Sequence, residues 1–161
     1  MVLYFAYGSN MDEKQMRKRM KDEMGWCCSD YLVGNCKLIG RGVLKGYALK
    51  FNKSASGPRE GYANIVPEEG SVVEGIVFEV DDNGMKRLDC REGVSSSNYY
   101  QKLLPIETEK GEKKCEAYIA CQGQVKEGLK PTEAYLKKLL AGKQYLSEEY
   151  YSKLSKTEKI D

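Results

Sequence analysis

The sequence predicts a single α+β domain whose sheet is curled or closed. About seven segments have the composition or alternation of β-strands, only a few have helical spacing, and the two kinds are mixed along the chain. No internal repeat, linker or low-complexity tract divides the 161 residues. Because a chain of this length buries a core of its own, we expect one domain over residues 1–161.

The first expected element is a strand at Val2–Tyr7, which runs directly into the tight turn Gly8-Ser9-Asn10. Its aromatic and aliphatic residues have strand composition. Beyond the turn, methionines recur every four residues as far as Met24, which is helical spacing. A side-chain oxygen of Ser9 or Asn10 is expected to cap this helix.

Several short strands are expected next. Tyr47–Phe51 alternates large apolar residues with small or charged ones, as a half-buried strand does. Asn52–Gly61 is polar and rich in turn-forming residues, which predicts a loop and the most mobile segment or lid. The sequence also predicts strands at Cys36–Ile39, at Val43–Leu44 and at Tyr62–Val66, the last one ending before Pro67.

The run Ser71–Val80 is the longest with β composition and has apolar residues on both faces, which predicts the middle of a sheet or barrel wall. Asp81 is expected to begin a short helix that ends at Cys90-Arg91-Glu92-Gly93 and buries Met85 and Leu88. The remaining elements are two strands joined by a charged hairpin at Glu107–Glu112, and two short helices: Tyr99–Ile106, Lys113–Cys121, Pro131–Leu140 and Ser147–Leu154.

Composition excludes several classes of function. With 41% hydrophobic residues, 31% charged residues and a formal charge of +2, nothing favours nucleic acid or an anionic membrane as a partner. The short N-terminal apolar run lacks a basic flank, so we expect neither signal peptide nor membrane span and predict a cytoplasmic protein. Because histidine is absent, no Ser-His-Asp triad, Cys-His pair or His-ligated metal is available.

Six cysteines occur without a C-x-x-C pair, at 27, 28, 36, 90, 115 and 121. This spacing disfavours structural zinc and thioredoxin-like chemistry and favours reduced, partly buried thiols, although an even count permits disulfides. No metal or organic cofactor is expected.

The turn Gly8–Asn10 directs several backbone N–H groups to one side, which suits a carboxylate or phosphate. The alternative is a capped strand-to-helix connection that binds nothing. Ser9 as a nucleophile is disfavoured, because without histidine it needs a lysine base that no motif supplies.

The stretch Y-F-A-Y-G-S-N-M resembles the signature of the γ-glutamylcyclotransferase family. A second element, L-D-C-R-E-G-V at Leu88–Val94, is similar to a segment of the family that carries its catalytic acid–base glutamate, here Glu92. The C-terminal P-T-E-A-Y-L-K-K-L-L-A-G and L-S-E-E-Y are also like the family. The resemblance implies a mostly antiparallel, barrel-like sheet with helices outside and a cavity near one end. It also implies substrate binding by a larger set: Tyr4, Phe5, Ala6, Tyr7, Gly8, Ser9, Asn10, Tyr99 and Tyr118.

The implied reaction is cyclisation of a γ-glutamyl group to 5-oxoproline with release of an amine. A carboxylate at its ordinary pKa is a weak base, so burial is expected to raise the pKa of Glu92. Without the resemblance, a lone glutamate after a short helix is more often solvated, and Glu74 and Glu79 are competing carboxylates. Residues 21–46 and the loop after Phe51 do not align with the family, and Ser97 stands where members often have glycine.

Three functions therefore stay open: a cyclotransferase acting on γ-glutamyl amino acids or related amides, one whose leaving group is an amine, and a non-catalytic domain that binds a small anion. The expected partner is a small γ-glutamyl molecule, and the protein is expected to be a monomer or homodimer. The leaving group is undetermined by the sequence.

Overall fold

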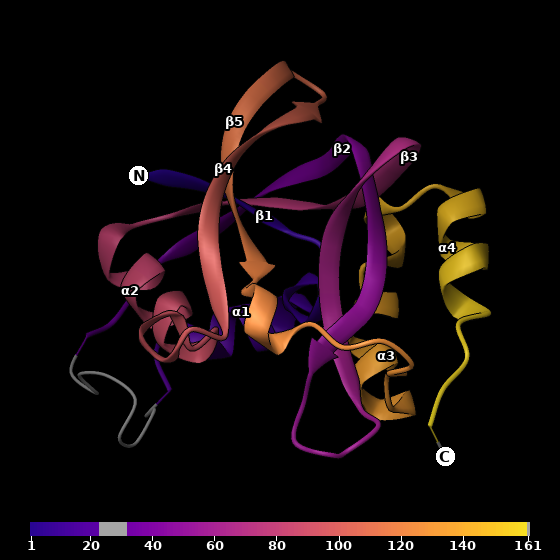
Figure 1. Cartoon of the computed structure of the whole chain (residues 1–161). Helices are drawn as coiled ribbons and strands as arrows, with labels where there is room; N and C mark the ends of the chain where they lie inside the picture. The colour runs from indigo at the N-terminus through magenta and orange to yellow at the C-terminus, as the bar shows by residue number, and fades with distance from the viewer. Residues whose placement is uncertain (23–31, 161) are drawn as a thin grey trace.

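The core of the fold is a closed barrel (Figure 1). The structure is a computed structural model that describes residues 1–22 and 32–160. Within these residues, five strands form the barrel in the order β1-β3-β2-β4-β5. Neighbouring strands are antiparallel except for β1 and β5, which meet in parallel at Tyr4 and Glu116. The predicted α+β class and the mixed, mostly antiparallel barrel are confirmed. The strands are β1 (Val2–Ala6), β2 (Cys36–Ser54), β3 (Gly61–Val80), β4 (Tyr99–Thr108) and β5 (Gly111–Ala120).

Strands β2 and β3 are much longer than the sequence predicted. Each replaces two or three expected short strands, and β3 continues through Pro67 instead of ending there. Pro67 is opposite Tyr47, beside a register shift in the β2–β3 ladder, and β1 pairs with β3 only from Ile76 onward. A proline without an N–H is tolerated at such an edge or bulge. The expected loop after Phe51 shrinks accordingly, because β2 extends to Ser54.

The barrel closes tightly where β1 crosses β3 next to the predicted turn. Gly75 lies so close to β1 that an added Cβ would be 2.3 Å from the carbonyl oxygen of Ala6. Its partner on β2 is Gly42, where a Cβ would meet Ile106 at 2.8 Å. Only glycine permits this approach of three strands. The interior beside them is filled by large apolar side chains such as Phe5 and Phe78, both fully buried.

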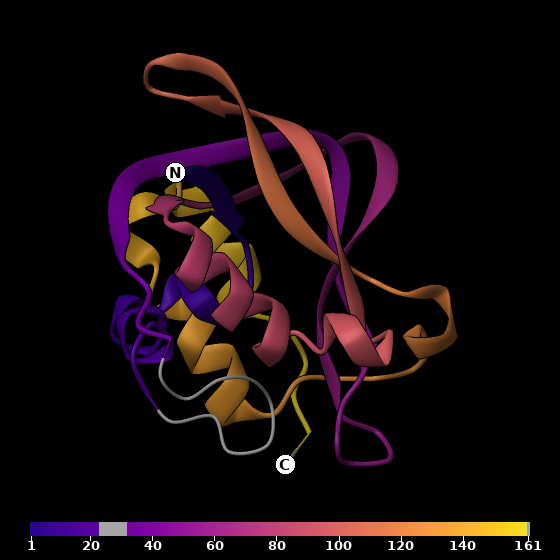
Figure 2. The same cartoon turned by 90° about the vertical axis from the view of Figure 1, so that its left-hand side faces the viewer.

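Strands β4 and β5 form a hairpin that reaches out beyond the rest of the barrel (Figure 2). The predicted charged hairpin at Glu107–Glu112 is confirmed, with a turn of only Glu109 and Lys110 between the two strands. Strand β4 pairs with β2 only at Thr108 and Glu107. The other end of β4, which begins at Tyr99, has no ladder pairing with β2; the end of β2 pairs instead with the segment after β5, through Lys53 and Val125.

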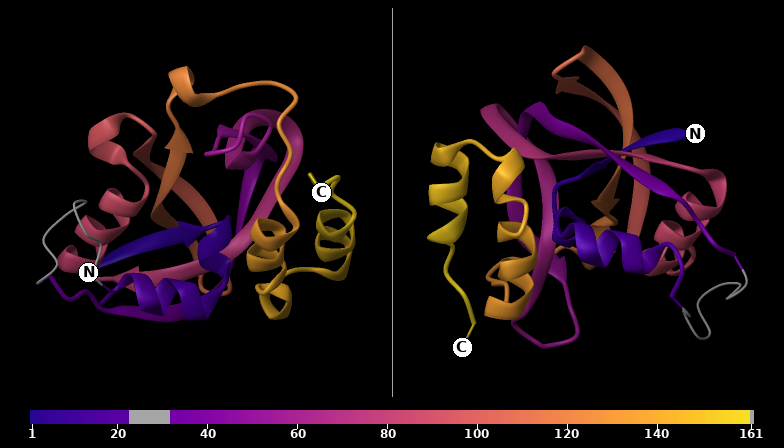
Figure 3. Two further views of the ribbon diagram at one scale, coloured as in Figure 1. Left: turned by 90° about the horizontal axis from the view of Figure 1, so that it is seen from below. Right: turned by 180° about the vertical axis from the view of Figure 1, so that it is seen from behind.

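Four α-helices lie outside the barrel among the described residues: α1 (Glu13–Arg19), α2 (Asp82–Arg91), α3 (Glu133–Leu140) and α4 (Glu148–Ser155). Helices α3 and α4 lie side by side on one flank (Figure 3). Asp81 caps α2 by accepting from the amide of Gly84 at 2.8 Å, and Met85 and Leu88 are buried, as predicted. No helix in residues 1–22 or 32–160 combines the length and the hydrophobicity needed to span a lipid bilayer.

The predicted cap of the first helix is wrong. Residues Ser9–Met11 form a single 3₁₀ turn, η1, and α1 begins only afterwards with Asp12 as its cap. The Asp12 carboxylate accepts from the amide of Lys14 at 3.1 Å. Met16 and Met20 are buried as the helical spacing predicts, and Met24 lies outside the described residues. The change matters, because it leaves Ser9 and Asn10 available for other contacts.

Candidate active site

A cavity of about 510 Å³ opens at the end of β1. Its wall combines the turn after β1, the C-terminal end of α2, the segment before β4 and one face of α3. These parts are far apart in sequence, and they bring together most of the predicted site residues. The cavity is lined by Tyr4, Tyr7, Gly8, Ser9, Asn10, Arg19, Lys53, Tyr62, Ala63, Cys90, Arg91, Glu92, Gly93, Ser95, Ser96, Asn98, Tyr99, Tyr118, Tyr135 and Lys138.

The turn Gly8–Asn10 keeps its backbone donors free. The carbonyl oxygens of Gly8 and Ser9 accept from Met11 and Asp12. The amide N–H groups of Gly8, Ser9 and Asn10, in contrast, have no acceptor among the described residues. Three unpaired amides on the wall of a cavity can bind a carboxylate or another anion.

Side-chain hydrogen bonds hold this turn in place. The amide nitrogen of Asn10, a buried residue, donates to the hydroxyl of Tyr4 at 3.0 Å. Its oxygen accepts from the Arg19 guanidinium at 2.9 Å and from Gln15 at 3.2 Å. Gln15 also donates to Ser9 Oγ at 2.9 Å. Ser9 therefore acts here as a hydrogen-bond acceptor, and among the described residues no lysine hydrogen-bonds to its hydroxyl.

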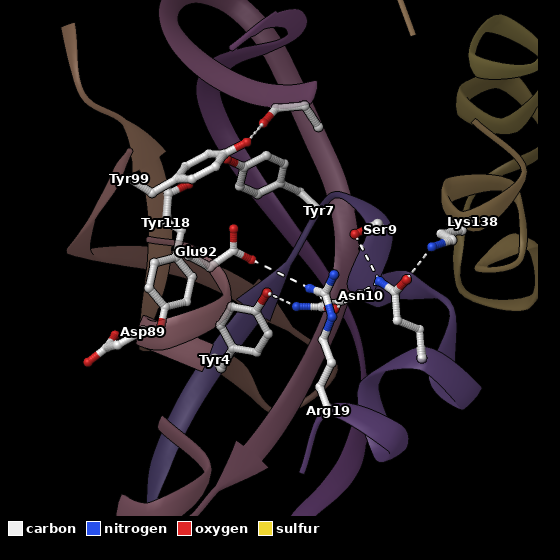
Figure 4. A network of polar contacts seen from close by, with 12 residues as sticks. Tyr4, Tyr7, Ser9, Asn10, Arg19, Asp89, Glu92, Tyr99, Tyr118 and Lys138 are labelled. Atoms are coloured by element: carbon white, nitrogen blue, oxygen red, sulfur yellow. Dashed lines mark hydrogen bonds and ion pairs between the residues drawn. The ribbon is translucent and has the colours of Figure 1, made fainter. Parts of the chain in front are cut away.

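Glu92 faces the turn from the opposite side (Figure 4). It is the C-cap of α2, and the following Gly93 adopts a left-handed conformation with φ 64° that ends the helix. The Glu92 side chain is 18% exposed, and its Oε1 lies 3.9 Å from Nη1 of Arg19. Burial raises the pKa of this carboxyl, while the positive charges of Arg19 and Lys53 oppose the rise. A carboxylate with a raised pKa is a better proton acceptor than an ordinary one.

Tyr99 and Tyr118 line the cavity, but their hydroxyl groups already have partners. Tyr99 donates to the carbonyl oxygen of Ala63 at 2.9 Å, and Tyr118 donates to Asp89 at 2.7 Å. Burial raises the pKa of both phenols. They therefore present ring surface to a ligand, while Tyr7 is held by the main chain of Tyr118.

Two residues of the predicted binding set do not line the cavity. Phe5 and Ala6 are fully buried and belong to the core, where they pair with Val77 and Ile76 of β3. The competing carboxylates are elsewhere too: Glu74 hydrogen-bonds to Ser147 at the start of α4, and Glu79 pairs in register with Leu3 and Lys37 on the barrel wall.

Sequence reasoning missed Arg19, Lys53 and Tyr135. No motif singled out Arg19, and Lys53 lay in the expected loop. Tyr135 belongs to the family-like C-terminal segment, and its hydroxyl accepts from the amide of Ala63 at 3.0 Å. Nothing local distinguishes these residues, since their cavity positions depend on α1, β2 and α3 meeting in space.

The cysteines differ in part from the expectation. Cys36, Cys115 and Cys121 are free, and burial raises the pKa of the Cys115 thiol to about 11. Cys90, which lines the cavity, is disulfide-bonded, so the expectation of reduced thiols is wrong at this position. Cys27 and Cys28 lie outside the described residues. Within residues 1–22 and 32–160, no group of three or more Cys, Asp or Glu side chains is arranged to hold a metal ion.

The fold is that of the γ-glutamyl cyclotransferases, a class of enzymes. A solved structure of a γ-glutamyl cyclotransferase matches 99% of this chain and 89% of its own length, with a TM-score of 0.82 and 26% identity. A family model described as "Gamma-glutamyl cyclotransferase, AIG2-like" matches residues 4–139. The chain therefore belongs to the γ-glutamyl cyclotransferase, AIG2-like family.

Relatives with this sequence pattern occur in distant organisms. The human γ-glutamylcyclotransferase is 27% identical over 166 residues, which cover 99% of this chain and 80% of the human protein. The Bacillus subtilis protein YkqA is 30% identical over 158 residues, which cover 96% of this chain. The match spans about half of YkqA, 51% of its length.

Proposed function

We propose that this protein cyclises the γ-glutamyl group of a γ-glutamyl amino acid or amide to 5-oxoproline and releases the amine, with Glu92 as the general acid and base. The observation that carries the proposal is the position of Glu92, a largely buried carboxyl that faces three unpaired backbone amides across one cavity. Family membership favours the same reaction.

The reaction needs no second substrate. The α-nitrogen of the γ-glutamyl group attacks its own γ-carbonyl carbon, a new C–N bond closes the five-membered ring, and the original C–N bond to the leaving amine breaks. Two protons leave the α-ammonium group, and both end on the departing nitrogen, which becomes an ammonium ion. Because the attack is intramolecular, holding the substrate folded supplies much of the rate.

Glu92 is suited to transfer these protons. Its raised pKa brings the carboxyl closer to the working pH of a general base. The Arg19 guanidinium lies 3.9 Å from this carboxyl and stabilises its ionised form, which is the form that accepts a proton. The amides of Gly8, Ser9 and Asn10 supply donors for the substrate α-carboxylate or for the oxyanion that develops on the γ-carbonyl.

The test is a panel of γ-glutamyl compounds, with 5-oxoproline and free amine measured as products. Glu92→Gln keeps the shape of the side chain but accepts no proton, so turnover should fall about 10²- to 10⁴-fold while the variant stays folded. Glu79→Gln is the matched control, because Glu79 is on β3 outside the cavity. Normal turnover by Glu92→Gln contradicts its role, and a wild-type protein that binds but converts no compound favours the non-catalytic domain.

A further inference from the structure

Lys53 is a buried cation in the wall of this cavity. It is on β2, one residue before the strand ends, and only 6% of the residue is exposed. Its ammonium group donates to the carbonyl oxygen of Ser54 at 2.8 Å and to Asn98 Oδ1 at 2.9 Å. An ammonium group has three donors, and only these two find acceptors among the described residues.

No carboxylate of the described chain forms an ion pair with Lys53. A buried charge is costly unless it is paired, and burial accordingly lowers the pKa of Lys53, an effect that the negative charge of Glu92 opposes. The rings of Tyr62 and Tyr99 lie 5.8 and 5.5 Å from its Nζ, and they stabilise the cation only in part. One donor and part of the positive charge therefore remain for a ligand.

The cavity carries its two most enclosed cations on different walls. Arg19 binds Asn10 beside the free amides of the turn. Lys53 binds Asn98, the residue directly before β4. Both cations act on the carboxyl of Glu92. An elongated ligand that binds the turn with one end and reacts at Glu92 therefore places its other end near Lys53.

We propose that Lys53 is a specificity-determining residue that binds the carboxylate of the departing amino acid. The inference rests on the proposed cyclisation and deepens it, because it selects a γ-glutamyl amino acid over an uncharged γ-glutamyl amine. An anionic leaving group completes the hydrogen bonds of the Lys53 ammonium and supplies its missing counter-charge. When the leaving group has no carboxylate, the buried cation stays without a counter-charge. The transition state for that substrate then gains no ion pair with Lys53.

The test compares two substrates that differ only in this carboxylate, γ-glutamyl-alanine and γ-glutamyl-ethylamine. Both close the same ring, and both release a small primary amine. For the wild-type protein we expect kcat/KM to be about 10- to 100-fold higher for γ-glutamyl-alanine, the range that a hydrogen bond to a charged group typically gives. Equal kcat/KM for the two substrates overturns the proposal whatever the variants do.

Lys53→Met removes the charge and keeps the aliphatic stem against Tyr62 and Tyr99. We expect the preference to fall to within about threefold, because kcat/KM drops more for γ-glutamyl-alanine than for γ-glutamyl-ethylamine, whereas any effect through Glu92 acts on both substrates alike. Lys53→Gln is a second variant that keeps a donor toward Asn98. Lys45→Met is the matched control: Lys45 is on the same strand, its side chain is 68% exposed, and it pairs with Glu107 outside the cavity.

The outcomes separate a binding role from a structural one. If Lys53 only holds β2 against Asn98, its variants lower kcat/KM for both substrates by the same factor, and the specificity proposal is overturned. Failure of the proposed function looks different, because the wild-type protein then converts neither substrate. Retention of the preference by folded Lys53→Met also refutes the inference.

Discussion

Glu74 offers the sharpest test of how the barrel and its outer helices are held together. Its carboxylate is 7% exposed and accepts from the amide of Ser147 at 2.7 Å and from the hydroxyl of Ser147 at 2.8 Å. The same hydroxyl accepts from the amide of Tyr150 and caps α4. Arg41 lies 3.3 Å from the carboxylate, but its own side chain is 39% exposed. Glu74 therefore links β3 to the cap of the last helix.

Glu74→Ala leaves both donors of Ser147 without an acceptor. A hydrogen bond to a charged group contributes about 1.5–3 kcal/mol, and the exposed ion pair adds little, so we expect a loss of about 3–5 kcal/mol in the free energy of unfolding. Glu74→Gln retains one acceptor for the Ser147 amide and should lose about 1–2 kcal/mol. With a urea m-value of about 1–3 kcal/mol/M, the larger loss lowers the denaturation midpoint by about 1 to 5 M.

The assay is urea denaturation followed by far-ultraviolet circular dichroism, with cyclotransferase activity measured on the folded variants. Ser147→Ala and the double variant complete a cycle, and the two losses should be clearly less than additive, because both remove the contact between the Ser147 hydroxyl and the carboxylate. Because Glu74 lies outside the cavity, activity per folded molecule should not change. A Glu74→Ala variant with a loss below about 0.5 kcal/mol, the range of neutral surface changes, refutes this account.

Two further predictions concern the cavity and the segment before β4. Because the pKa of Glu92 is raised in the folded state, its neutral form favours folding, and this stability is lost as the pH rises through the folded-state pKa. Glu92→Gln should therefore unfold at higher urea than wild type at pH 7.5 and at nearly the same urea at pH 4; a variant less stable at pH 7.5 contradicts the assignment. Ser97 is exposed and has φ 56°, a left-handed conformation that costs a non-glycine residue about 1 kcal/mol. Ser97→Gly should raise the thermal midpoint, with the exposed Ser155→Gly in helix α4 as a control that lowers it.

The sequence was informative wherever local physics decides the structure. Alternation and composition along Ser71–Val80 predicted a strand that is covered on both faces. In the barrel this segment is part of β3 and pairs with β1 and β2. Asp81 and the Gly93 that follows Glu92 set both ends of α2 through a cap and a left-handed residue. The motif Gly8-Ser9-Asn10 predicted a turn with free amides, and the resemblance to the family indicated Glu92 as the candidate acid–base residue.

The tertiary structure decided what depends on distant segments meeting. A register shift opposite Pro67 allows β3 to continue where local rules predicted an end. Packing of β1 against β3 buries Phe5 and Ala6, although they belong to the family signature. Lys53 looked like a polar loop residue, yet β2 extends past it and brings its ammonium group to Asn98, 45 residues further along the chain. Charge and burial at such a position are set by closure of the barrel, which no local pattern encodes.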